Sequence, residues 1–172
     1  NGVTNSIDWL EWKIVINGIT PEGNQDLQNS INKIKSTVTG KALIEQLEKS
    51  VKTYTITGMT GSSTQATFSD GGEVTGANIT ARVLGTEPAI GYFQPEHWDC
   101  LAHELMHAKQ LEDGTWVPSP TGTDTKWENE VDACRETNRM IAETGDDREL
   151  RKKYGDKDLP SDAYTNLHPR TE

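Results

Sequence analysis

The stretch PEHWDCLAHELMHAKQLEDG, residues 95–114, decides the fold. Pro95 lies near its start, Asp99 is a candidate N-cap, and Gly114 follows its last apolar turn. Proline and a capping side chain at the beginning, with glycine just past the end, are typical of an α-helix. We therefore expect one helix over this stretch, with its apolar face packed against the rest of the domain.

Within that helix, HELMH fits the pattern HExxH. His103 and His107 are four residues apart, so they lie on one face of a helix, and Glu104 points to their side. Two imidazoles on one face can bind the same ion, and this pattern is typical of zinc hydrolases in which the glutamate is the general base. The sequence therefore predicts zinc as the cofactor, with His103 and His107 as ligands.

A catalytic zinc has three protein ligands and one open position, so HExxH alone is incomplete. Metzincins supply a third histidine six residues after the second, but this chain has Asp113 there and lacks the pattern HxxGxxH. That class is excluded. The gluzincin arrangement, in which a later helix supplies a glutamate, is the remaining source of the third ligand.

The stretch TKWENEVDACRETNRMIAETG, residues 125–145, predicts such a helix and offers three glutamates. Glu128 is expected to form a capping box with Thr125, and Glu136 is kept in reserve as a ligand. Both also fit a solvated helix face. Glu130 is the preferred third ligand, because the buried seam would lie on its side of the helix, formed by Trp127, Val131 and Cys134.

The two cysteines lie about one helical turn from proposed ligands. Cys100 precedes His103 by three residues, and Cys134 follows Glu130 by four. Two helices holding one ion would bring the sulfurs near each other, so a disulfide is one expectation. Two buried free thiols are the alternative. Zinc ligation by the thiols is less favoured, since it would close the open position.

The rest of the chain predicts an α+β fold. Alternating apolar residues indicate strands at 10–18, 51–58 and 77–85, with a short strand candidate between loops at 58–65 and 69–73. Helical spacing over residues 24–50 indicates one broken helix or two short ones, divided near Thr37–Gly40. We expect a zincin-like arrangement, in which a small mixed or antiparallel sheet packs on the HExxH helix and on a second long helix that Gly145 ends.

The 172 residues suit one domain, residues 1–172. The tail is expected to begin helically at RELRKK and to end as a polar extension over residues 155–172. The chain starts without methionine, so we expect a domain cut from a longer protein, with any targeting signal outside it.

Composition limits the partners. The formal net charge is −10, and nucleic acid and anionic membrane surfaces both need clustered Lys and Arg, so neither is expected as a main partner. No apolar run is long enough to span a bilayer.

Three stretches resemble the zinc metallopeptidases of bacterial type III and type VI secretion effectors and polymorphic toxins. They are STVTGKALIEQLE, GTEPAIGYFQPEHWDCLAHELMHAKQLEDGTW and ENEVDACRETNRMIAETGDDRELRKKYG, and together they span most of the chain. By position, the resemblance implies that His103 and His107 are ligands, that Glu104 is the catalytic base and that Glu130 is the third ligand. Arg151 and Tyr154 fall on the R-x-x-Y segment of the family.

The resemblance implies a zinc-dependent endopeptidase that is secreted or delivered into a target cell, either the periplasm of a competitor or a host cell. Its expected partners are a protein or peptide substrate and an immunity or inhibitor protein. Two other functions are considered: a catalytically silent module of a larger secreted protein that keeps zinc as a structural staple, and a zinc amidase acting on cell-wall peptides. The retained Glu104 argues against the silent module, because a structural site has no use for a base.

For the mechanism, we expect Glu104 to take a proton from the zinc-activated water. Tyr154 is the candidate donor to the developing oxyanion, and His97 and His168 are weaker candidates. An extended substrate is expected to add as a strand to the sheet edge beside the cleft, along residues 77–85 or 89–93.

Overall fold

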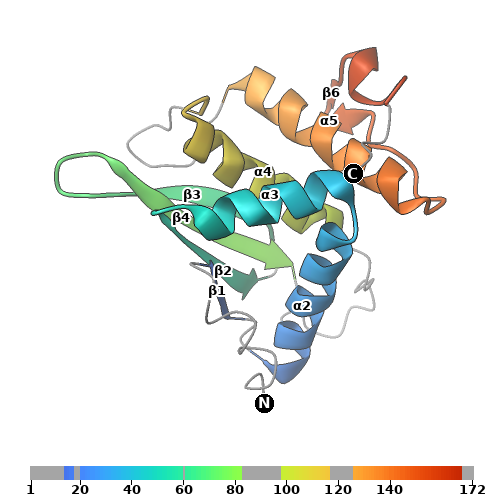
Figure 1. Ribbon diagram of the computed structural model, residues 1–172. Helices are drawn as coiled ribbons and strands as arrows, with labels where there is room; N and C mark the ends of the chain where they lie inside the picture. The colour runs from blue at the N-terminus through green and yellow to red at the C-terminus, as the bar shows by residue number, and fades with distance from the viewer. Residues whose placement is uncertain (1–13, 18–19, 60, 83–97, 117–125, 168–172) are drawn as a thin grey trace.

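The computed structural model describes five segments of the chain (Figure 1). Along these segments a short strand is followed by two helices, three strands, two further helices, a short hairpin and a 3-10 helix, Ser161–Ala163. The described residues are 14–17, 20–59, 61–82, 98–116 and 126–167. The helices are α2 (Pro21–Lys35), α3 (Val38–Lys49), α4 (Trp98–Asp113) and α5 (Trp127–Thr144). The strands are β1 (Ile14–Asn17), β2 (Thr53–Met59), β3 (Ser63–Phe68), β4 (Val74–Arg82), β5 (Lys153–Tyr154) and β6 (Lys157–Asp158). The predicted α+β class is confirmed.

The main sheet is small and mixed, with strand order β1-β2-β4-β3. β1, β2 and β4 are parallel, whereas β3 runs antiparallel to β4. The expectation that residues 77–85 form the edge beside the cleft is therefore wrong, because β4 pairs on both sides. The edge on the β4 side is β3, which begins within the expected 58–65 loop and is joined to β4 by a short turn at 69–73. The other candidate edge, 89–93, lies outside the described residues.

The helical region after β1 consists of two helices, not one broken helix. Thr37 separates them: its side chain accepts a hydrogen bond from the Gly40 N–H at 2.9 Å, and its hydroxyl donates to the Ile34 carbonyl at 2.8 Å. A Cβ at Gly40 would lie 2.1 Å from that same carbonyl oxygen, so the close turn requires glycine. The first helix starts earlier than expected, at Pro21, with Thr20 as its N-cap.

α4 is the central helix of the fold. It packs against β3 and β4 on one side and against α5 on the other, and α2 and α3 also contact it (Figure 1). Its apolar side chains are almost fully buried among those of the sheet and the other helices, notably Leu101, Ala102, Leu105 and Ala108. Full burial of a leucine contributes about 1.5–3 kcal/mol, so this helix is held rigidly in the core. It therefore forms a fixed platform for its polar residues.

Both predicted N-terminal caps are wrong, whereas the predicted helix ends are confirmed. Trp98 is already helical, so Asp99 lies in the first turn, where it pairs with Arg148 at 2.9 Å. The N-cap of α5 is Lys126, which makes no side-chain capping bond, and Thr125 lies outside the described residues. Gly114 and Gly145 end α4 and α5 with φ of 71° and 72°.

The tail does not begin as a helix, because the side chain of Asn138 on α5 forms hydrogen bonds with the backbone of the tail. The Asn138 Oδ1 accepts from the Arg151 N–H at 2.8 Å, and its Nδ2 donates to the carbonyls of Arg151 and Ala163 at 2.9 and 2.8 Å. These bonds replace the helical ones, and the chain continues into the β5–β6 hairpin. The stretch expected as a polar extension buries Leu159 and Ala163 against α5.

Candidate metal centre

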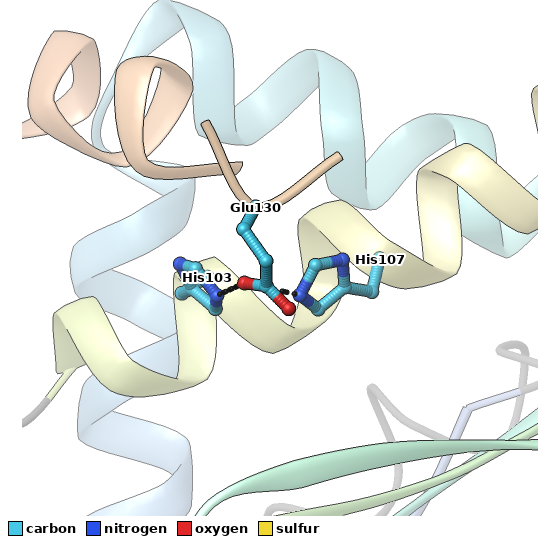
Figure 2. Close-up of side chains that lie close together, drawn as sticks. All are labelled: His103, His107 and Glu130. Atoms are coloured by element: carbon cyan, nitrogen blue, oxygen red, sulfur yellow. Dashed lines mark hydrogen bonds and ion pairs between the residues drawn. The ribbon is translucent and has the colours of Figure 1, made fainter. Parts of the chain in front are cut away.

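The two histidines of α4 and one glutamate of α5 meet between the helices. Figure 2 shows the Glu130 carboxylate between the two imidazole rings. The Nε2 atoms of His103 and His107 lie 2.9 and 3.3 Å from the same Glu130 oxygen, Oε2. All three side chains are buried, and their ligand atoms lie within 4.8 Å of one another. Residues far apart in the sequence thus form one group that could hold a metal ion.

The charges in this group suit a cation. Burial would raise the pKa of Glu130, but hydrogen bonds from His103 and His107 outweigh it and hold the pKa at about 2. The carboxylate is therefore ionised at neutral pH. Burial would lower the pKa of His107, but Glu130 and Gln110 accept from its two ring nitrogens and raise it.

The residues present fit a divalent metal. Two imidazole nitrogens and one carboxylate oxygen are the donor set of a catalytic zinc site with an open position. Within the described segments, no other group of three histidine, cysteine or acidic side chains could hold an ion in this way. Of the other two glutamates considered, Glu128 is exposed and Glu136 pairs with Arg139 at 3.0 Å. The structure brings only Glu130 to the histidines.

Glu104 lies on the same helix as the histidines and is 8% exposed. The hydroxyl of Thr64, on the edge strand β3, lies 2.6 Å from its Oε2 and 3.0 Å from its backbone carbonyl. The shorter contact is a strong hydrogen bond from a hydroxyl to a carboxylate. β3 therefore fixes the orientation of Glu104, and one carboxylate oxygen is left for other contacts.

Tyr154 reaches the site from the β5–β6 hairpin. Its ring stacks on His103 with centroids 5.4 Å apart and planes inclined by 10°. Burial, the charge of Glu130 and a hydrogen bond to it raise the pKa of Tyr154, so the phenol keeps its proton at neutral pH. Arg151 lies 6.0 Å from the Tyr154 ring. The weaker candidates for the same role, His97 and His168, lie outside the described residues.

Cys100 and Cys134 are not joined in the structure, so the disulfide considered from the sequence is absent. Cys134 lies behind His103, with its Sγ 3.7 Å from Nδ1, the nitrogen that does not face Glu130. An Arg151 nitrogen lies 4.0 Å from the same sulfur. The thiol of Cys134 therefore lies beside one of the candidate metal ligands.

Three residues that support the site were not identified from the sequence. No sequence pattern around Thr64 or Asn138 predicted their roles, because each forms hydrogen bonds with residues that are distant in the sequence. Gln110 follows His107 by three residues and so lies on the same helix face. That spacing from a candidate metal-binding histidine is the signal that could have identified Gln110.

The α+β fold and the buried group of two histidines and a glutamate define a candidate metal-dependent enzyme. A scan against protein-family models matches residues 15–156 to peptidase family M91, described as effector protein, and the chain belongs to this family. The effector-type metallopeptidase resemblance inferred from the sequence is thereby confirmed. Searches of curated proteins and of solved structures found no significant match.

Membership in a peptidase effector family indicates a protein substrate and delivery into a target cell. Among the described residues, no helix is both long and apolar enough to cross a bilayer.

Proposed function

We propose that the protein is a zinc-dependent endopeptidase with a zincin-like fold, which acts as a delivered bacterial effector or toxin domain. One observation carries the proposal: the Nε2 atoms of His103 and His107 both face one carboxylate oxygen of Glu130 in a buried site. That donor set is the one expected for a catalytic zinc. The family assignment supports hydrolysis of peptide bonds.

His103, His107 and Glu130 would hold the ion, and their burial in two packed helices keeps them in place. When bound, zinc supplies a Lewis acid that acidifies water and polarises the scissile carbonyl.

Glu104 is the proposed general base. It takes a proton from water while the water oxygen attacks the carbonyl carbon, and it then passes this proton to the amide nitrogen as the C–N bond breaks. The products are a carboxyl group and an amine. Since Thr64 lies against Oε2, the other oxygen of Glu104 is left for the water proton.

Tyr154 is the proposed donor to the developing oxyanion. A donor must remain protonated, and the raised pKa of this phenol meets that requirement. Its position against His103 places it at the edge of the ligand group.

The proposed substrate is an extended segment of a protein in the target cell, added as a further strand along β3. β3 carries Thr64, which touches Glu104, and on its outer side it pairs with no other strand of the described residues. An immunity or inhibitor protein that covers this site is a second proposed partner.

Metal removal tests the proposal. Protein purified without added zinc should contain about one zinc ion per chain by elemental analysis, since one site has three ligands. It should cleave an unfolded protein such as casein, phenanthroline should abolish the cleavage, and added zinc should restore it. A protein that takes up no zinc when it is offered, or that cleaves equally well after chelation, would exclude zinc-dependent hydrolysis.

Substitution of Thr64 tests the orientation of Glu104. Thr64→Val keeps the shape but removes the hydroxyl, so kcat should fall about tenfold, as expected for the loss of one hydrogen bond to a charged group. Thr64→Ser should restore much of the activity. Zinc content should be unchanged in both variants. Thr57→Val, at a partly buried position on the internal strand β2, is the matched control. An unaltered kcat in Thr64→Val would show that Glu104 needs no such support.

A further inference from the structure

We propose that Gln110 is a positioning residue that fixes the orientation of His107 and ties it to the helix that carries Glu130. The inference rests on the proposed zinc site, because it concerns how two of its ligands are held. Gln110 is 3% exposed and lies one helical turn after His107 on α4.

The side-chain amide of Gln110 bridges the two helices. Its Oε1 lies 2.8 Å from the His107 Nδ1, the ring nitrogen that does not face Glu130. Its Nε2 donates to the backbone carbonyl of Asn129 at 2.9 Å and to the carboxylate of Asp132 at 3.1 Å. Asn129 immediately precedes Glu130 in the sequence. The Gln110 amide therefore contacts both His107 on α4 and the backbone next to Glu130 on α5.

These contacts require both an acceptor and a donor on one side chain. When the Nε2 of His107 binds a metal, its Nδ1 carries a proton and needs an acceptor. The Asn129 carbonyl and the Asp132 carboxylate accept only, so they need a donor. Glutamine meets both needs, and the network also fixes which end of the amide faces His107. A glutamate here could accept from His107 but could donate to neither partner on α5.

The backbone of Gln110 supports the same histidine from another side. Its carbonyl accepts from the N–H groups of Thr115 and Trp116 at 2.9 and 3.2 Å, as the chain turns at the end of α4. This turn places the Trp116 ring 5.4 Å from the His107 ring. Trp116 is 3% exposed, so His107 is enclosed by a buried indole and a buried amide.

Among the described residues, no side-chain amide contacts the other histidine in this way. The Nδ1 of His103 faces the Cys134 sulfur at 3.7 Å, and a thiol is a weak hydrogen-bond partner. The Nδ1 of His107 therefore faces a stronger hydrogen-bond acceptor than the Nδ1 of His103 does. Loss of Gln110 should therefore weaken metal binding and not merely loosen the fold.

The test compares zinc dissociation constants, measured by competition with a chromophoric chelator, for the wild type and three variants of the whole chain. Gln110→Met keeps the length of the side chain but removes all its hydrogen bonds. Gln110→Glu keeps the acceptor for His107 and removes the donor to α5. Gln28→Met is the matched control, because Gln28 is also buried but lies on α2, which carries none of the proposed ligands.

Gln110→Met should bind zinc about 10- to 100-fold more weakly than the wild type, the usual cost of losing a partner of a metal-bound histidine. Gln110→Glu should also bind more weakly, through the lost link to α5, whereas Gln28→Met should bind as the wild type does. Nuclear magnetic resonance of the zinc-loaded wild type should show a slowly exchanging His107 Nδ1–H proton. This proton should exchange faster in Gln110→Met and stay protected in Gln110→Glu.

Thermal unfolding of the metal-free proteins separates positioning from a purely structural role. A structural role alone would lower the melting temperature of Gln110→Met and leave the zinc affinity of the folded protein unchanged, which would overturn the inference. Unchanged affinity in Gln110→Glu would overturn the link to α5. A wild type that binds zinc while every variant matches it would reject the inference and leave the proposed function standing. A wild type that binds no zinc would reject both.

Discussion

Glu104→Gln should reduce kcat by about 10²- to 10⁴-fold, the range that a general base contributes, while the protein keeps its zinc. The amide has the size of the carboxylate and can still accept from the Thr64 hydroxyl, so the fold around it should persist. It cannot take a proton from water at neutral pH. Hydrolytic activity should therefore be lost while zinc binding is retained.

The measurement combines steady-state cleavage of a protein substrate, zinc content and thermal unfolding on the same preparations. Glu128→Gln is the matched control, because it makes the same change at an exposed glutamate and should remain fully active. A Glu104→Gln protein that keeps more than a tenth of the activity would remove Glu104 as the base. If the wild type bound zinc but cleaved nothing, the zinc would act only as a structural staple.

The local parts of the site could be predicted from the sequence because helix geometry fixes them. His103 and His107 share a face at a spacing of four residues, and the apolar seam of α5 placed Glu130, not Glu128, toward the core. Thr37 and Gly40 marked the division between α2 and α3. Each of these inferences uses contacts within a few residues, where chain geometry decides the outcome.

The parts that depend on long-range contacts could not be predicted in this way. β4 became an internal strand because β3 folds back beside it, and an alternating pattern does not give strand order. The tail became a hairpin because Asn138 binds the backbone of Arg151, a contact that helix propensity ignores. Thr64 touches Glu104 across the packing of sheet and helix. Such partners come from tertiary structure.

Glu130→Gln should weaken zinc binding by more than about 100-fold. Loss of a residue that only hydrogen-bonds to a metal ligand costs up to about 100-fold, and loss of a ligand should cost more. The change replaces an anionic ligand with a neutral amide in a buried site, so the attraction for a cation falls with little change in shape. Protein purified without added zinc should then lack the metal, and its hydrolytic activity should fall with the zinc content.

Competition with a chelator gives the dissociation constant, and elemental analysis gives the occupancy. Glu128→Gln makes the same change in charge two residues earlier in α5, on an exposed side chain, and should bind zinc as the wild type does. Equal weakening in both variants would show that the net charge of α5 matters and not a bond from Glu130. Full occupancy in Glu130→Gln would exclude Glu130 as the third ligand, whereas selective loss would show that α5 must be docked on α4 for the site to exist.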